Sequence, residues 1–291
     1  MSVRIAKNSG FCFGVKRAIN MAFEAAKQNK NIVTLGPIIH NPQMVKKLEN
    51  ENIVHIDDIV EINHRTTIIR SHGIEKNVME HLEKNGVELI NATCPYVSKT
   101  QQYAEELSKQ NYQVIILGDK NHPEVIALRS YAQKNVIVVA KADELPTTKF
   151  QKVGIISQTT RRFEDFQNLV DALLPQCTEM RVINTICKAT SVRQISTLEL
   201  AKESDLMIVI GGKNSSNTKM LAKISTKFVK THHVETATEI EDSWFSKIEK
   251  VGLTAGASTP DWVIVEVYNK VIEIMGNVNG NVEKIEEIPG F

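Results

Sequence analysis

Short apolar runs alternate along this chain with longer stretches in which apolar residues recur every three or four positions. Three of the runs are rich in β-branched residues and end at Gly36, Gly118 and Gly211. Brief runs of this kind predict strands that are buried on both faces of a sheet. The spacing of residues such as Ala18 and Ala22 predicts amphipathic helices between them. The alternation predicts an α/β protein with mainly parallel sheets and helices on both faces.

The apolar runs belong to a longer pattern that occurs three times. Cys12, Cys94 and Cys187 each precede one of the three glycines by 24 residues. Three matches in register indicate an internal repeat, whose units need one another to bury their apolar faces. In each repeat we expect a short strand, the cysteine loop and then a helix. The predicted pseudo-threefold modules span residues 1–92, 93–185 and 186–276, followed by a C-terminal tail, 277–291.

A threefold repeat can bring its three cysteines to a common centre. Thiolates are the soft ligands that select zinc, copper(I) or iron–sulfur clusters. Three cysteines would leave one iron of a cubane cluster open, and an open metal position is typical of catalytic sites. The alternative is that the cysteines are small core residues, but their shared register favours ligands. Cys177 lies outside the repeat, so we interpret it as an ordinary thiol.

Polar loops follow the predicted strands, at the edge where parallel sheets bind ligands. Helix N-termini next to these loops offer N–H groups to phosphate. The imidazoles, hydroxyls and amides there suit a diphosphate, whose oxygens each accept several hydrogen bonds. For Ser216 or Thr160 alone, helix capping is the simpler interpretation. The candidate substrate-binding residues are His40, His72, His122, Thr159, Ser215, Ser216, Asn217 and Ser258.

Glu124 is the one carboxylate beside a histidine of the repeat. A buried carboxyl group near other anions has a raised pKa and can deliver protons near neutral pH. A glutamate in the first turn of a helix is also favoured by the helix dipole. Both interpretations of Glu124 stay open at this point.

Charge and composition exclude several classes of protein. The net charge of +1 gives no overall basic field for nucleic acid or membrane surfaces. The apolar runs are too short to span a membrane, and the first residues do not form a signal peptide. Four cysteines in such a chain argue against a disulfide framework. We therefore expect a cytoplasmic protein, or one in a compartment that is kept equally reducing.

Eight short motifs together resemble one family across essentially the whole chain. They are SGFCFGVKRAI, GPIIHNP, RSHG, NATCP, GDKNHPE, SQTT, GGKNSSNT and TAGAS. The chain is similar to the 4-hydroxy-3-methylbut-2-enyl diphosphate reductases, the IspH or LytB family. The resemblance implies the last step of the non-mevalonate isoprenoid pathway, in which the substrate loses its hydroxyl to give isopentenyl and dimethylallyl diphosphates.

The same resemblance implies a cofactor and residue roles. A 4Fe–4S cluster with one open iron would be held by Cys12, Cys94 and Cys187, in the centre of three α/β modules. The substrate would be bound by the polar residues named above, and Glu124 would feed protons. A ferredoxin or flavodoxin would donate electrons, because the chain has no dinucleotide fingerprint. Two rivals are a non-catalytic iron–sulfur sensor and a zinc hydrolase with three cysteine ligands.

Overall fold

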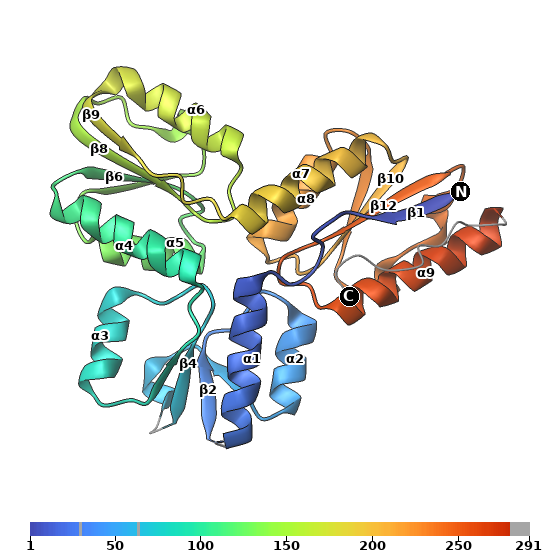
Figure 1. Cartoon of the computed structure of the whole chain (residues 1–291), viewed down its shortest axis with the longest axis horizontal. Coiled ribbons are helices and arrows are strands. Elements are labelled where there is room, and N and C mark those ends of the chain that lie inside the picture. The colour runs from blue at the N-terminus through green and yellow to red at the C-terminus, as the bar shows by residue number, and fades with distance from the viewer. Residues whose placement is uncertain (29–30, 63–64, 280–291) are drawn as a thin grey trace. The chain divides into compact units, whose positions relative to one another are not determined.

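The computed structural model describes residues 1–28, 31–62 and 65–279 (Figure 1). The chain forms two compact units. One unit comprises Met1–Phe13, His40–Met44 and the chain from Lys188 onward. The other comprises Gly14–Ile39 and Val45–Cys187. None of the helices that the structure describes is both long and apolar enough to cross a membrane.

The larger unit, which starts at Gly14, contains two parallel four-stranded sheets. The first has the order β3-β2-β4-β5 and the second the order β7-β6-β8-β9. Its strands are β2 (Ile32–Leu35), β3 (Val54–Ile56), β4 (Thr66–Ile69), β5 (Leu89–Asn91), β6 (Gln113–Leu117), β7 (Val136–Val139), β8 (Phe150–Ser157) and β9 (Cys177–Val182). Its helices are α1 (Phe13–Gln28), α2 (Pro42–Asn50), α3 (Lys76–Lys84), α4 (Pro95–Lys109), α5 (Pro123–Ala132) and α6 (Phe163–Leu173). The first residue of α1 and the start of α2, up to Met44, are assigned to the smaller unit.

The smaller unit contains the third parallel sheet, with the order β1-β12-β10-β11. Its strands are β1 (Ser2–Ile5), β10 (Leu206–Ile210), β11 (Lys230–Val234) and β12 (Lys250–Ala255). Its helices are α7 (Lys188–Lys202), α8 (Ser216–Ser225) and α9 (Asp261–Asn279). Residues 277–279 of the expected tail continue α9, and the rest of that tail lies outside the described residues.

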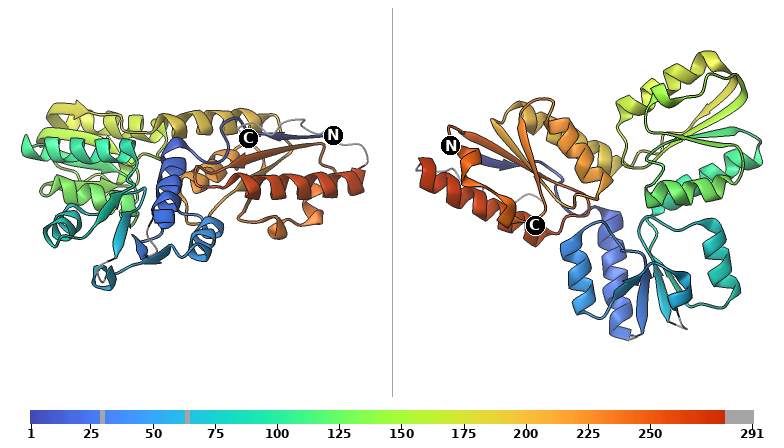
Figure 2. Two further views of the ribbon diagram at one scale, coloured as in Figure 1. Left: turned by 60° about the horizontal axis from the view of Figure 1, so that its bottom comes forward. Right: turned by 180° about the vertical axis from the view of Figure 1, so that it is seen from behind.

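Alternation along β10 explains why helices cover both faces of this sheet. Leu206 and Ile208 pack in the same core as Val267 of α9. Met207, which points the other way, packs with Leu200 of α7. A strand reverses its side chains at every residue, so a run that is apolar throughout needs a helix on each side. Figure 2 shows α9 on one face of this sheet and the α7–α8 pair on the other.

The predicted fold class is confirmed: the protein is α/β with three parallel sheets. One detail of the repeat was wrong. The strand before Cys12 was expected to open the first module, but β1 pairs with β12 of the third sheet. The strands before Cys94 and Cys187 likewise pair with β4 and β8, which precede them. The strand before each cysteine therefore completes the sheet of the preceding repeat. For Cys12, the first cysteine in the chain, that sheet belongs to the third repeat.

Candidate active site

The three cysteines of the repeat occupy equivalent positions at helix starts. Each immediately precedes the first residue of α1, α4 or α7, and each is partly exposed. No disulfide involves any cysteine in the part of the chain that the structure describes. Cys177 lies elsewhere, at the start of β9, where burial raises the pKa of its thiol.

Backbone hydrogen bonds show the repeat at the level of single atoms. Each cysteine amide donates to a backbone carbonyl in the loop that follows β12, β4 or β8. The three bonds are Cys12 to Ala257 at 3.1 Å, Cys94 to Ser71 at 3.0 Å and Cys187 to Thr159 at 3.0 Å. The cysteine loops are thus fixed to the same polar loops that the sequence analysis selected as ligand-binding segments.

Two arginines that sequence reasoning missed also form hydrogen bonds to two of the cysteine loops. Arg17 of α1 donates to the carbonyl oxygen of Thr93 at 3.1 Å, one residue before Cys94. Arg193 of α7 is buried and donates to the carbonyl oxygen of Gly10 at 2.8 Å, two residues before Cys12. Their positions, five and six residues after a cysteine, were a signal that could have found them. Each guanidinium keeps a cysteine loop in place and adds a positive charge beside it.

Glu124 lies in the first turn of α5 and is 1% exposed. The amide of Thr159 donates to its Oε1 at 2.7 Å, and the Thr159 hydroxyl donates to its Oε2 at 2.9 Å. Burial raises the pKa of Glu124 to about 7, although the two hydrogen bonds from Thr159 act in the opposite direction. The carboxyl group can therefore exist in both protonation states near neutral pH.

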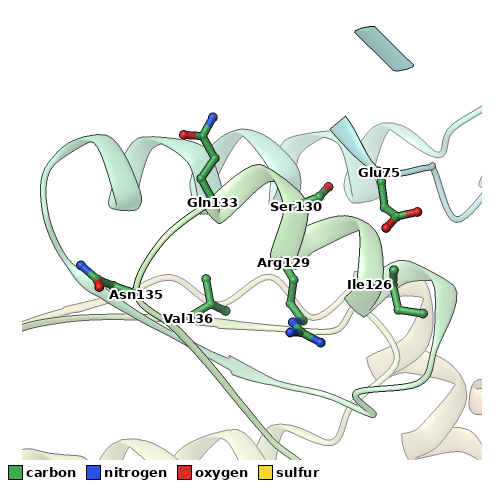
Figure 3. Close-up of a pocket in the computed structure, with 7 residues that line it drawn as sticks. All are labelled: Glu75, Ile126, Arg129, Ser130, Gln133, Asn135 and Val136. Atoms are coloured by element: carbon green, nitrogen blue, oxygen red, sulfur yellow. The ribbon is translucent and has the colours of Figure 1, made fainter. Parts of the chain in front are cut away.

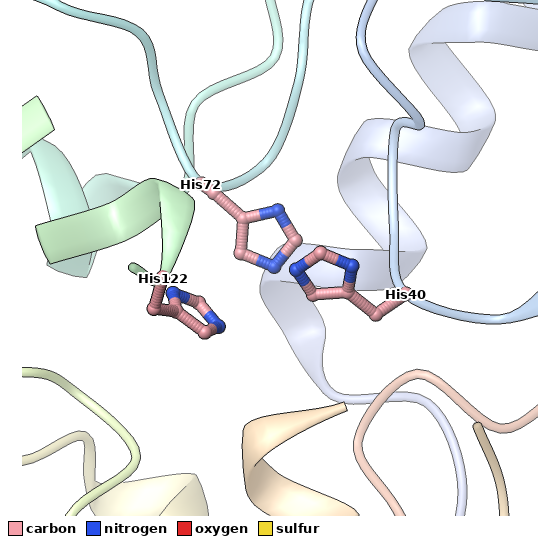
Figure 4. Close-up of side chains that lie close together, drawn as sticks. All are labelled: His40, His72 and His122. Atoms are coloured by element: carbon pink, nitrogen blue, oxygen red, sulfur yellow. The ribbon is translucent and has the colours of Figure 1, made fainter. Parts of the chain in front are cut away.

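His122 caps the helix that carries Glu124. Its Nδ1 accepts a hydrogen bond from the Glu124 amide at 3.2 Å. Nδ1 can accept only without a hydrogen, so a neutral His122 ring carries its proton on Nε2. The ring of His72 lies edge-on to that of His122, with centroids 5.5 Å apart (Figure 4). The larger unit therefore brings together His72, His122, Glu124 and Thr159.

The remaining candidates lie in the smaller unit. Ser215 is the N-cap of α8, and its hydroxyl accepts from the Thr218 amide at 3.3 Å. The Ser258 hydroxyl lies 3.1 Å from the carbonyl oxygen of His40 and 3.4 Å from the Ser215 hydroxyl. Ser216 follows as the first residue of α8 and is partly exposed. Five of the expected loop residues, His40 and Asn217 included, thus belong to one folded unit.

Asn217 is the clearest sign of a ligand in this unit. Its side chain is buried, at 4% exposure, yet neither its amide nitrogen nor its amide oxygen has a hydrogen-bond partner among the described residues. A buried amide without partners is costly. The Asn217 amide is therefore suited to bind a polar ligand at the start of α8.

A separate surface pocket contains none of the candidate residues (Figure 3). It lies where the start of α3 meets the end of α5, beside a hydrogen bond from the Lys76 amide to the Ser130 hydroxyl. The residues that line it are Glu75, Ile126, Arg129, Ser130, Gln133, Asn135 and Val136. None of the cysteines or polar loop residues of the repeat lines this pocket, so we exclude it from the candidate site.

Comparison with known proteins decides the family. The family model described as "LytB protein" matches residues 3–272. This chain belongs to the LytB family. It is 48% identical to the 4-hydroxy-3-methylbut-2-enyl diphosphate reductase of Geotalea uraniireducens, over 96% of this chain and 100% of that protein. The reductase of Geobacter sulfurreducens is 47% identical, again over 96% of this chain and 100% of the relative.

Solved structures of LytB-family reductases have the same fold. One, described as the terminal enzyme of the non-mevalonate pathway, is 43% identical with a TM-score of 0.67 and covers 94% of this chain and 99% of its own. The reductase of Plasmodium falciparum is 30% identical with a TM-score of 0.86 and covers 99% of this chain and 94% of its own. The comparisons thus extend over nearly the whole length of both proteins.

LytB proteins depend on iron and sulfide, and the residues of this chain fit such a group. Three thiols stand at equivalent helix starts, each with its amide already bonded to a loop carbonyl. Cysteine thiolates are the ligands that hold an iron–sulfur cluster. Gly14 keeps space at one of these thiols, because a Cβ built on it would lie 2.5 Å from the Cys94 sulfur.

This close approach predicts the effect of a small substitution. Gly14→Ala is expected to displace the Cys94 side chain and to lower the iron content of the purified protein roughly 10–100-fold, as changes beside metal ligands do. Alanine otherwise favours helices over glycine, so thermal unfolding should show that the variant is folded. Gly276→Ala is the matched control, because a Cβ built there would lie more than 4 Å from every described residue outside its own stretch of helix. Normal iron content in Gly14→Ala would contradict the prediction.

Proposed function

We propose that this chain is a 4-hydroxy-3-methylbut-2-enyl diphosphate reductase, an enzyme that removes the substrate hydroxyl by two-electron reduction. One observation within the structure carries the proposal most strongly. The buried Glu124 carboxyl is hydrogen-bonded to Thr159, and the Thr159 carbonyl accepts the Cys187 amide. A proton donor is thereby coupled through one residue to a loop that carries a predicted metal ligand.

We assign Cys12, Cys94 and Cys187 as the ligands of a 4Fe–4S cluster with one open iron. When bound, such a cluster passes electrons one at a time and acts as a Lewis acid toward the substrate hydroxyl. The fourth cysteine, Cys177, has no role in this assignment. Its position at the start of β9, outside the repeat, supports leaving it out.

Glu124 is assigned as the source of protons. Hydroxide is a poor leaving group, so breaking the C–O bond requires a proton that converts the hydroxyl into water. The complete reaction takes up two electrons and two protons and releases one water. Glu124, with a pKa of about 7, can give up a proton at neutral pH and regain it afterwards. The Thr159 hydroxyl, 2.9 Å from Glu124 Oε2, is placed to relay it.

The diphosphate would be held by the polar residues of the strand-end loops. The proposed set is His40, His72, His122, Thr159, Ser215, Ser216, Asn217 and Ser258. Hydroxyls, imidazoles and amides can each donate to a diphosphate oxygen, and the buried Asn217 amide supports such a role. A firmly held diphosphate orients the allylic carbon for reduction.

The pKa of Glu124 predicts a specific pH dependence of kcat. The protonated carboxyl is the donor, and its fraction falls about tenfold per pH unit above its pKa. We therefore expect kcat at saturating substrate to be level below pH 7 and to decline above it, with one apparent ionisation near the value of about 7. Steady-state rates between pH 6 and 9 measure this decline. A profile that stays level to pH 9 would assign the proton to another group.

We further propose a cytoplasmic enzyme that receives electrons from a ferredoxin or flavodoxin. The proposal is tested first by metal analysis of anaerobically purified protein. Iron with an equal amount of sulfide is expected. Zinc without sulfide would favour a hydrolase with three cysteine ligands, and a cluster without substrate-dependent turnover would favour a sensor.

A further inference from the structure

The loop that carries His72 joins β4 to α3, and both belong to the first sheet. Helix α3 begins at Lys76, four residues after His72, and its Leu82 packs in the core of that sheet. His122 instead caps α5, whose Leu128 packs in the core of the second sheet. The rings of His72 and His122 have centroids 5.5 Å apart. Their placement therefore depends on the contacts that join α3 and its loop to the helices of the second sheet.

The first of these contacts caps α3 from another helix. The Lys76 amide donates to the hydroxyl of Ser130, on α5, at 2.8 Å. The first amides of a helix have no partner within it and are usually bound by the N-cap side chain. The N-cap residue of α3, Glu75, forms no such hydrogen bond within the described chain. The Ser130 hydroxyl also donates to the Ala127 carbonyl at 2.6 Å, which fixes its orientation. Ser130 therefore takes the place of the N-cap side chain and ties the start of α3 to α5.

The second contact is an ion pair with α4. The Lys76 ammonium lies 2.9 Å from Glu105 Oε1, and the Lys109 ammonium lies 2.8 Å from the same oxygen. The side chains of Lys76 and Glu105 are only 24% and 25% exposed, and a partly buried pair is screened less by salt than a surface pair. Leu107 of α4 packs in the same core as α5, so this ion pair also links α3 to the second sheet.

The third contact lies directly beside His72. Gly73 has a φ of +74°, and a Cβ built on it would clash with Nε2 of Gln101, on α4. The Gln101 side chain is buried, so it packs closely against the backbone of Gly73. On the other side of His72, the Ser71 carbonyl accepts the Cys94 amide at 3.0 Å. The residues before and after His72 thus contact α4 or the residue that precedes it.

We propose that Ser130 and Glu105 are positioning residues, which act through Lys76 to hold His72 beside His122. This inference rests on the proposed function, in which both imidazoles bind the diphosphate of the substrate. Two groups bind one ligand well when they are placed in advance, because ordering them during binding costs free energy. The contacts with α4 and α5 supply this placement where the His72 loop ends.

Loss of both contacts should affect substrate binding more than the chemical step. The start of α3 would no longer be tied to α5, so His72 would shift away from His122. Glu124 would keep its place, because α5 stays packed in the second core and Thr159 still donates to the carboxylate. Loss of an interaction that is equally strong in the ground state and the transition state raises KM and leaves kcat unchanged.

The test is the Glu105→Gln/Ser130→Ala variant of the cluster-loaded protein. We expect its KM for 4-hydroxy-3-methylbut-2-enyl diphosphate to rise about 10-fold, while kcat changes less than about twofold. Ser130→Thr keeps the hydroxyl and should keep the KM of the parent protein. Glu179→Gln is the control, because it breaks an ion pair with Lys152 that joins β8 to β9 at 3.2 Å. An unchanged KM in the double variant would overturn the inference, and so would an equal rise in KM in Glu179→Gln.

A second readout does not depend on turnover. In anaerobic crystals of the cluster-loaded double variant, the ring centroids of His72 and His122 should lie at least ~1 Å farther apart than 5.5 Å. An unchanged separation would overturn the positioning role even if the parent protein is an active reductase. A parent protein without turnover would contradict the proposed function, and a wider separation in the variant would still support the placement of the two rings by Ser130 and Glu105.

Discussion

Replacement of Cys94 by serine is expected to remove iron, sulfide and turnover together. A hydroxyl is a harder and weaker ligand for iron than a thiolate. No neighbouring group can take the place of the lost sulfur, because Gly14 packs against it and the Cys94 amide is hydrogen-bonded to the Ser71 carbonyl. We expect a larger loss than the roughly 10–100-fold that follows changes beside metal ligands. Iron and sulfide analysis and anaerobic turnover measure it.

Cys177→Ser provides the matched control for this experiment. Cys177 is partly exposed like the other cysteines, but it lies at the start of β9 and outside the repeat. The variant should keep its iron, its sulfide and its turnover. A Cys94→Ser protein with full cluster and full turnover would contradict the ligand assignment, as would an equal loss in Cys177→Ser.

Glu124→Gln is expected to lower kcat about 10²–10⁴-fold, the usual contribution of a positioned proton donor. Glutamine has the same shape, and its Oε1 can still accept from the Thr159 amide. Iron content and KM for the diphosphate should therefore stay close to those of the parent protein. Because only proton delivery is removed, the loss should appear in kcat and kcat/KM alike. An unchanged kcat would reduce Glu124 to a structural role.

The same variant should change the pH dependence of folding stability. The pKa of Glu124 rises from an ordinary 4.5 to about 7 in the folded protein. Between these values the folded state binds more protons than the unfolded state, so the free energy of unfolding falls as pH rises. The fall amounts to roughly 3 kcal/mol and ends above pH 7. Denaturant unfolding should show this fall in the parent protein and not in Glu124→Gln. If Glu124 had a normal pKa in the folded protein, the free energy of unfolding would depend on pH in the same way in both proteins.

The fold was largely predictable because buried parallel strands leave a strong local signal. The runs before Gly36, Gly118 and Gly211 correspond to the central strands β2, β6 and β10. The partner of β1 could not be predicted in this way, because an edge strand has the same apolar pattern whichever sheet it joins. Its pairing with β12 depends on a contact between residues at opposite ends of the chain.

The candidate site shows the same limit. The shared spacing of the cysteines was enough to identify the three candidate ligands. The sequence spacing could not show whether Glu124 is a buried proton donor or only an acid that stabilises the start of its helix. The structure shows that its oxygens accept from Thr159, 35 residues away, and not from amides of its own helix. Gly14 was missed because its importance arises from its close approach to the Cys94 sulfur, which no local pattern encodes.

The central claim is that this chain reduces an allylic diphosphate. The most direct test is anaerobic incubation of cluster-reconstituted protein with 4-hydroxy-3-methylbut-2-enyl diphosphate and a low-potential chemical reductant. We predict that isopentenyl and dimethylallyl diphosphates both form, with two electrons consumed per substrate. Recovery of unchanged substrate from protein shown to contain iron and sulfide would contradict the account.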